Sequence, residues 1–263
     1  MILLFTTAYP EKNSVRRAEI QECLRRNIDC AEIEEILILV EEGATVPQST
    51  KIRTRLVPAR PTYDDYFAWI REIASESDVS VVANADIYFD ETISAIATFR
   101  PGPSEVFALS RWNITPEGDA RLYDHNDSQD VWVFSGKPRA VNADFPVGVP
   151  RCDNRLVHEL IEAGYHVSNP SFSIRSFHLH AGEREPYGEN PAGYVEPPYK
   201  YVWPTNLLSL VATLIHNARN PGQRILWRLD SRWWSKRLKL HLFGKGRRAL
   251  LSLFSRSGNL AGR

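Results

Sequence analysis

Apolar runs of strand length alternate with helix-like runs over the first half of the chain, and this alternation constrains the fold more than any other feature of the sequence. Residues Ile2–Thr7 and Val79–Ala83 are largely apolar, as expected of strands buried on both faces. We expect further strands at Ile36–Val40, Lys51–Val57 and Val106–Leu109, and helices at Arg16–Asn27, from Thr62 to about Ser77, and at Glu91–Thr98. This order predicts an α/β fold with a mostly parallel central sheet flanked by helices.

The second half of the chain has shorter strand patterns and one strong helical pattern. Asp153–Gly164 predicts a helix that ends at Gly164 and turns Leu156, Leu160 and Ile161 toward the core. We expect short strands at Ala120–Tyr123, Val131–Phe134, from Val167 onward and at Ser173–His180, and an apolar helix at Asn206–Ala218. Residues 181–204, rich in Gly, Pro, Glu and Tyr, have the composition of a lid, a binding loop or a linker.

The formal net charge of zero conceals an uneven distribution of charge along the chain. Residues 1–130 contain 13 Lys and Arg against 23 Asp and Glu, and residues 131–217 contain 7 against 8. Residues 218–263 contain 12 against 1. The sequence therefore predicts an acidic body with a basic tail, which is typical of a protein whose tail has an anionic partner.

Basic and apolar side chains in the tail have the spacing of an amphipathic helix. One helical stripe holds Arg224, Arg228, Arg232, Lys236 and Lys239, and the apolar arc beside it includes Trp227, Trp233 and Trp234. Such helices suit an anionic membrane surface. Packing against the body or another copy is the alternative, and nucleic acid is not expected because the acidic body lacks a broad basic footprint.

We expect three parts: an α/β domain at 1–182, a loop and apolar helix that complete the body at 183–217, and a membrane-association tail at 218–263. The longest apolar stretch, Leu207–Ile215, is too short to span a bilayer. The N-terminal run Met1–Phe5 lacks the basic segment and length of a signal peptide. Three cysteines without CxxC spacing favour neither a disulfide framework nor a zinc site. We expect a cytoplasmic protein that is peripheral at the inner face of the cell membrane.

The strongest local feature is the pair of polar residues, Asn84 and Asp86, directly after the apolar run Val79–Ala83. Ligands of open α/β sheets bind at the carboxyl ends of strands, so Asp86 is well placed to hold a divalent cation. Carboxylate oxygens favour Mg²⁺ or Mn²⁺. The alternative is a turn that uses Asn and Asp for local hydrogen bonds, and Asp90 is better placed to cap the next helix.

This segment resembles the DxD motif of nucleotide-sugar-dependent glycosyltransferases with the GT-A fold. Asn84 stands at the first position of that motif and Asp86 at the second, more essential one. The resemblance implies that Asp86 binds a metal ion that bridges the donor diphosphate, with Asn84 beside the donor.

A second stretch, from Phe145 to His180, resembles the inverting family-2-like members of this group and extends the resemblance over about residues 1–182. Cys152-Asp153 matches an acidic pair that opens a helix, and only its second carboxylate is present here. The resemblance implies that Asp153 is the base that deprotonates the acceptor hydroxyl. Because Asp153 begins a predicted helix, it is also a candidate N-cap, and the two roles are compatible.

The segment Asp127–Phe134 resembles a strand that precedes the acceptor loop in bacterial and viral members. This implies that Gln129 and Asp130 bind donor or acceptor sugar and makes Asp130 the second candidate base, with a solvated turn at the strand start as the alternative. His178 and His180 alternate on a predicted strand and therefore point to opposite faces. The resemblance implies that one of them, with His178 favoured, completes the metal shell or contacts the donor phosphate.

The remaining candidates are nucleotide- and donor-binding residues. The resemblance implies that residues at the first strand end hold the base and that residues around the second helix contact the nucleotide. We expect a further residue, which follows another strand and precedes a tryptophan, to touch the sugar, because an aromatic face suits the apolar face of a pyranose. These are Thr6, Thr7 and Tyr9, then Arg60 and Tyr63, and then Arg111. Surface exposure or packing is the alternative for each.

These motifs together predict a metal-dependent glycosyltransferase that uses Mn²⁺ or Mg²⁺. It would move a sugar from a nucleoside diphosphate sugar to a hydroxyl of a glycan or lipid-linked acceptor, with inversion, in bacterial surface-polysaccharide assembly. One alternative is a sugar nucleotidyltransferase, although such enzymes normally have a glycine-rich basic loop after the first strand and residues 7–13 contain no glycine. The other is a catalytically silent membrane-associated adaptor, because both acidic motifs lack their first carboxylate.

Overall fold

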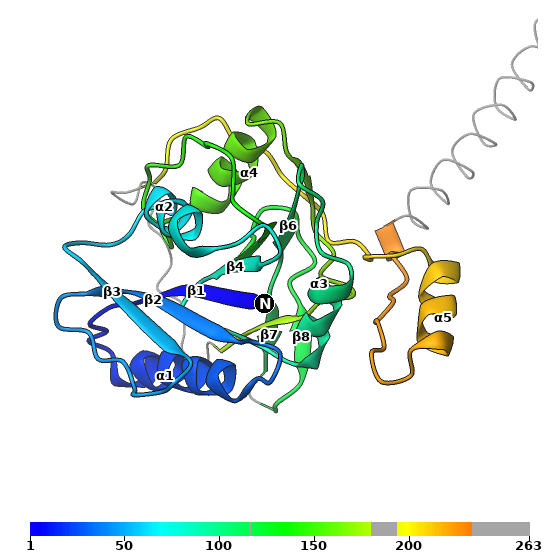
Figure 1. The fold of residues 1–263 in the computed structure, drawn as a ribbon, viewed down its shortest axis with the longest axis horizontal. Coiled ribbons are helices and arrows are strands. Elements are labelled where there is room, and N and C mark those ends of the chain that lie inside the picture. Colours follow the sequence, from blue (N-terminus) through cyan, green and yellow to red (C-terminus); the bar gives the residue numbers. More distant parts are fainter. Residues whose placement is uncertain (116, 180–193, 233–263) are drawn as a thin grey trace, which may run out of the picture. The chain divides into compact units, whose positions relative to one another are not determined.

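Seven strands form the central sheet, in the order β10-β6-β9-β4-β1-β2-β3. They are β1 (Ile2–Ala8), β2 (Glu35–Glu41), β3 (Ile52–Val57), β4 (Val79–Ala83), β6 (Glu105–Leu109), β9 (Val131–Ser135) and β10 (His166–Ser168). Strand β9 runs antiparallel to both of its neighbours, and the other pairings in this sheet are parallel (Figure 1). The expected α/β fold with a mostly parallel sheet is confirmed.

The structure is a computed structural model that describes residues 1–115, 117–179 and 194–232. The chain divides into two units, Met1–Trp227 and Arg228–Arg263. Several predicted features lie outside the described residues: His180, most of the 181–204 loop, and the part of the tail from Trp233 onward, with Trp234, Lys236 and Lys239.

Helices cover both faces of the central sheet. They are α1 (Ser14–Asp29), α2 (Tyr63–Ile73), the 3-10 turn η1 (Glu91–Ile93) with α3 (Ser94–Thr98), and α4 (Cys152–Glu162). Alternate residues of the strands point to opposite faces, so Phe5 packs with α2 and α4, while Leu4 packs in the cluster of α1 and α3. Figure 1 shows α2 and α4 on one side of the sheet and α1 on the other.

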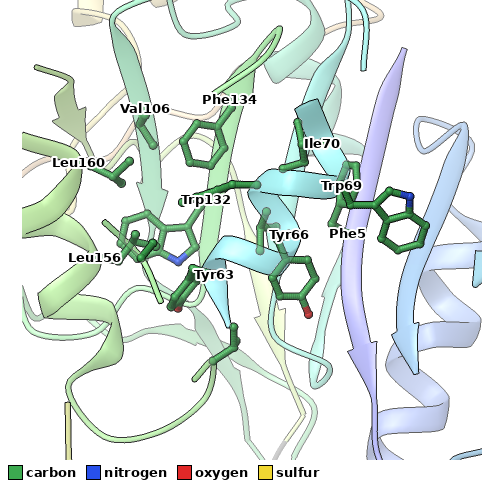
Figure 2. Packing of buried hydrophobic residues seen from close by; sticks show 14 of the residues in the cluster. Phe5, Tyr63, Tyr66, Trp69, Ile70, Val106, Trp132, Phe134, Leu156 and Leu160 are labelled. Atoms are coloured by element: carbon green, nitrogen blue, oxygen red, sulfur yellow. The ribbon is translucent and has the colours of Figure 1, made fainter. Parts of the chain in front are cut away.

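The core beneath α2 and α4 is aromatic. Trp132 of β9 meets Tyr63 of α2 edge-to-face, with ring centroids 6.2 Å apart. Figure 2 shows these two side chains together, with Leu156 and Leu160 of α4 in the same cluster. This packing fixes the start of α4 against β9, and both elements carry predicted site residues.

Four short strands form a second sheet, and two of them were not predicted from the sequence. Its order is β5 (Ile87–Phe89), β11 (Ser176–His178), β7 (Trp112–Ile114) and β8 (Ala120–Leu122), and β5 and β7 were not expected. Asn27 of α1, buried in the core, holds β5 in place: its Nδ2 donates to the Ile87 carbonyl at 2.8 Å, and its Oδ1 accepts from the Phe89 N–H at 3.1 Å. Because Ile87 is opposite His178, this sheet brings the end of β11 beside Asp86.

Three predicted elements differ from the structure near their ends. Helix α2 ends at Ile73 rather than about Ser77, because the Asp78 carboxylate accepts from the Ser75 N–H at 2.8 Å and hydroxyl at 2.7 Å and stabilises a turn there. Residues 173–175 do not join the strand predicted for 173–180, since the Ser173 N–H bonds back to the Pro170 carbonyl at 2.9 Å. Of the residues expected to face the core from α4, Ile161 is 37% exposed.

Helix capping follows the sequence more closely. Thr62 caps α2 in a capping box with Asp65, Asp90 caps η1 through the Thr92 N–H, and Gly164 ends α4 in the left-handed conformation (φ +82°). The apolar helix α5 (Leu210–Arg219) starts later than expected because Ser209 caps it through the Ala212 N–H.

The predicted tail helix does not include its first residues. Residues 224–230, with Arg224, Trp227 and Arg228, have no helical structure. Asn217 explains the difference, because its amide accepts from the Ile225 N–H at 2.8 Å and donates to the Ile225 carbonyl at 2.9 Å. Both backbone groups of Ile225 are thereby withdrawn from helical bonding. Within the described residues, no helix combines the length and apolarity required to cross a membrane.

Candidate functional site

The carboxyl ends of β4 and β6 meet the start of β9 at one edge of the central sheet. Val131 is paired with both Ala83 and Leu109, so the residues just beyond these three positions come together. A cavity of about 680 Å³ lies at this edge. Ten of the predicted site residues line it: Tyr9, Arg60, Tyr63, Asn84, Asp86, Arg111, Gln129, Asp130, Asp153 and His178.

Two predicted nucleotide-binding residues do not line this cavity. Thr6 is buried within β1, and the Thr7 hydroxyl donates to the Leu39 carbonyl of β2 at 3.0 Å. Both side chains are directed into the sheet and its packing, so the packing alternative describes them better. Tyr63 is a mixed case: it borders the cavity, but it is fully packed in the core and its hydroxyl lies 3.7 Å from the Cys152 Sγ.

Asp86 lies in the turn between β4 and β5 and is bound by two side chains at one oxygen. Its Oδ2 is 3.0 Å from the His178 Nε2 and also accepts from the Arg16 guanidinium. Burial alone would raise the pKa of this carboxyl, but the bonds from His178 and Arg16 outweigh burial and hold the pKa well below its usual range. Asp86 is therefore a fixed negative charge at the cavity wall.

His178 is held at both ring nitrogens. Its Nδ1 lies 3.1 Å from the Asn113 Oδ1, and the same oxygen accepts from the Arg111 Nε at 3.1 Å, which identifies it as the amide oxygen. Its Nε2 faces Asp86. Both ring nitrogens of His178 therefore face oxygen atoms of neighbouring side chains.

The predicted metal ligands therefore do not fit a divalent cation in this arrangement. Asp86 and His178 bond to each other, and a guanidinium occupies the same carboxylate oxygen. Among the residues that the structure describes, no group of three His, Cys, Asp or Glu side chains is placed to hold a metal ion. The Asp86 Oδ1 is buried without a partner there, but one oxygen beside a guanidinium is a poor cation site. Mn²⁺ or Mg²⁺ binding, including a role for His180, stays a sequence prediction.

Asp130 is held in a buried ion pair. Its carboxylate accepts from the Arg111 Nη1 at 3.0 Å, and the two side chains are 10% and 6% exposed. Asn84 at the end of β4 donates to the Asp130 Oδ1 at 3.1 Å, and its N–H bonds to the Asp130 carbonyl at 3.1 Å. Asn84 thus joins the end of β4 to the start of β9. Asp130, bonded to both Asn84 and Arg111, holds this part of the cavity wall together.

Asp153 has a different environment from Asp130. Its carboxylate accepts from the Gln129 N–H at 3.2 Å and the Asn154 N–H at 2.9 Å. The N-cap alternative is wrong, because α4 begins at Cys152 after Arg151, which takes a left-handed conformation (φ 72°) and makes no side-chain cap bond. Burial, and then the negative charge of Asp130, raise the pKa of Asp153 to about 7. A carboxylate that titrates near neutrality in a cavity is suited to general-base chemistry.

Sequence reasoning missed Arg16, Asn113 and Asn154. Arg16 lies in the first turn of α1, close behind the carboxyl end of β1, and lines the cavity. The Asn154 side chain is fully buried, and neither of its polar atoms has a partner among the described residues. The Gln129 Oε1 is also buried without a hydrogen-bond partner among these residues, although its Nε2 donates to the carbonyls of Asn126 and Val202 at 3.2 and 3.3 Å. The proximity of Arg16 to a strand end was the one signal available in the sequence.

Two solved structures share part of the fold. The 4-diphosphocytidyl-2C-methyl-D-erythritol synthase of Anaerococcus prevotii superposes with a TM-score of 0.34 at 13% identity, over 51% of this chain and 69% of that chain. The 2-C-methyl-D-erythritol 4-phosphate cytidylyltransferase of Francisella tularensis gives a TM-score of 0.37 at 11% identity, over 51% and 72%. No protein-family model and no curated protein matches the chain. A likeness of this size carries no inference about the activity of this chain.

Proposed function

We propose that the chain is a glycosyltransferase that moves a sugar from a nucleoside diphosphate sugar to a hydroxyl group of a glycan or lipid-linked acceptor. The observation that carries this proposal is the Asp153 carboxylate, which faces the cavity with a pKa raised to about 7. A hydroxyl nucleophile needs a base, and a base is most effective when its pKa lies near the working pH.

The proposed reaction inverts the anomeric carbon in one step. The acceptor hydroxyl transfers its proton to Asp153 while its oxygen bonds to the anomeric carbon. The bond from that carbon to the diphosphate oxygen breaks, and the nucleoside diphosphate leaves with the electron pair. Asp153 then releases the proton to water. Burial, and then the nearby Asp130 in its ion pair with Arg111, maintain the raised pKa of Asp153.

Sugar nucleotidyl transfer is the second candidate, and the Francisella tularensis structure is named a cytidylyltransferase. That reaction attacks a nucleoside triphosphate and releases pyrophosphate. The segment between β1 and α1 has no glycine, and of its residues only Tyr9 borders the cavity within the described part of the chain. A backbone cradle for a triphosphate is therefore poorly supported, and the position of Asp153 favours sugar transfer.

Product analysis tests the proposal and separates the two reactions. The full chain is incubated with UDP-, GDP-, CDP- and dTDP-sugars, with water as the acceptor, and separately with nucleoside triphosphates and sugar 1-phosphates. We expect slow release of a nucleoside diphosphate from one donor class. Release of pyrophosphate from the triphosphate mixture, without diphosphate release from any donor, would replace sugar transfer with nucleotidyl transfer.

We also propose that residues 218–263 bind an anionic membrane surface on the cytoplasmic side, near a lipid-linked acceptor. The charge of this segment, 12 basic against 1 acidic residue, supports the proposal. Helix α5, just before it, exposes Val211 and Leu214 at 66% and 60%. Co-sedimentation with anionic vesicles, and none with neutral vesicles, is the expected result. Equal binding to both vesicles would exclude electrostatic attachment.

A further inference from the structure

We infer that Arg16 supplies the positive charge that receives the donor diphosphate, so that nucleotide binding by this chain needs no divalent cation. The inference rests on the proposed function, because it assigns the diphosphate subsite of the same cavity. It replaces the predicted metal ion with a side chain of this chain.

The Arg16 guanidinium is fixed in position by three acceptors. It bonds to the Asp86 Oδ2, to the Leu179 carbonyl at 2.8 Å and to the Glu19 carboxylate at 3.0 Å. These contacts come from the turn after β4, the end of β11 and the next turn of α1. The side chain is 19% exposed and lines the cavity. A guanidinium held in this way loses little further freedom when an anion binds.

The position of Arg16 is also the position expected of the metal. In the sequence prediction Asp86 and His178 together hold a cation, whereas in the structure Arg16 bonds to Asp86 at the oxygen that faces His178. A divalent cation would have to displace the guanidinium and break the bond between His178 and Asp86. Arg16 therefore already places a positive charge where the metal ion was predicted.

A second guanidinium, that of Arg60, borders the same cavity. Arg60 is exposed and has no ion-pair partner among the described residues. Arg16 and Arg60 both act electrostatically on the Tyr9 hydroxyl, where they oppose the effect of burial, which raises its pKa. All three side chains line the same cavity. A diphosphate offers two anionic groups, and Arg forms paired charge-assisted hydrogen bonds with such groups.

The experiment measures nucleoside diphosphate binding by calorimetry, with UDP, GDP, CDP and dTDP as probes, in EDTA and in excess Mn²⁺ or Mg²⁺. We expect one nucleotide to bind with the same Kd, within about twofold, in all three buffers. Binding that disappears in EDTA and returns with metal would overturn the inference and leave the proposed function intact. No binding of any nucleotide in any buffer would overturn the proposed function itself.

Variants at two adjacent positions of α1 provide the matched comparison. Arg16→Met should raise the Kd at least about tenfold in EDTA, since it removes charge-assisted bonds to the diphosphate. Arg17→Met is the control, because the Arg17 side chain is exposed, bonds only the Glu11 carbonyl at 3.3 Å within the described part of the chain, and does not line the cavity. Arg16→Lys, which keeps the charge but not the paired geometry, should fall between them. An unchanged Kd for a folded Arg16→Met protein would overturn the inference.

Discussion

Asp130 and Asp153 face one cavity, but only Asp130 has a cationic partner among the described residues, the Arg111 guanidinium at 3.0 Å. Asp153 accepts hydrogen bonds from the backbone N–H groups of Gln129 and Asn154. Burial, and then Asp130, raise the pKa of Asp153 to about 7. The two acids therefore differ in their partners: one is held by a guanidinium and the other by backbone N–H groups.

The first prediction concerns the pH dependence of turnover. The base is active as a carboxylate, so kcat/KM for donor hydrolysis should rise with pH and level off above a midpoint of about 7, the pKa of Asp153. The measurement is a pH–rate profile of the full chain with its preferred nucleotide sugar. A rise centred near the ordinary aspartate pKa of about 4 would remove Asp153 as the base.

The second prediction concerns Asp153 itself. Asp153→Asn should lower turnover by about a hundredfold to ten-thousandfold, the range that general-base catalysis contributes. The Kd for the nucleoside diphosphate should remain unchanged, because the carboxylate contacts the acceptor rather than the donor. The control is Asp144→Asn, an exposed carboxylate that does not line the cavity. Equal turnover in the two variants would contradict the assignment.

The third prediction concerns stability. The folded protein holds the Asp153 proton up to a pH of about 7, whereas the unfolded chain releases it near the ordinary value of 3.8. The folded state therefore binds more protons between these values, and the contribution of Asp153 to the free energy of unfolding should fall as pH rises through this window. Urea unfolding across that range, for wild type and Asp153→Asn, isolates the effect. Parallel pH curves for the two proteins would show that the carboxyl is not perturbed.

The fourth prediction concerns the buried ion pair. Arg111→Met removes the cationic partner of the buried Asp130, which should cost about 3–5 kcal/mol in the free energy of unfolding. The comparison is Arg53→Met, which breaks the pair with Glu35 at the sheet edge, where the side chains are 53% and 28% exposed. That substitution should cost about 0–1 kcal/mol. Similar losses in urea unfolding would mean that the Arg111–Asp130 pair does not act as a buried pair.

Long apolar runs predicted the central sheet well. The buried run Val79–Ala83 is β4 at the same two residues, and the strands predicted at Ile2–Thr7 and Ile36–Val40 end within a residue of β1 and β2. The missed strands β5 and β7 have three residues each, too few for a period to be recognised. Their formation depends on tertiary contacts, such as the amide of Asn27 on β5, which no local pattern encodes.

The site was predictable where strand ends carry unusual polar residues. Asp86, Asp130 and Asp153 were expected and line one cavity, although their roles remain proposals. Arg16 was not expected, because an arginine on a helix is most often a surface residue and its contact with Asp86 joins positions 70 residues apart. Asn154 was not expected because its importance lies in the absence of partners among the described residues, which only packing reveals.

The residues that line the cavity are of two kinds, since some are held by strands of the central sheet and others lie in loops. The Asn84 amide, just after β4, donates to Asp130, just before β9, and both strands are paired on each side. The Asp153 carboxylate accepts from the N–H of Gln129, the residue before Asp130. Tyr123, Asp127 and Ser128, and residues 147–151, also line the cavity and belong to connecting segments rather than to strands. Substitutions in those segments can reshape the space above Asp153 while the reacting groups keep their spacing. In the proposed glycosyltransferase, such loop changes would admit new acceptors without moving Asp130 or Asp153.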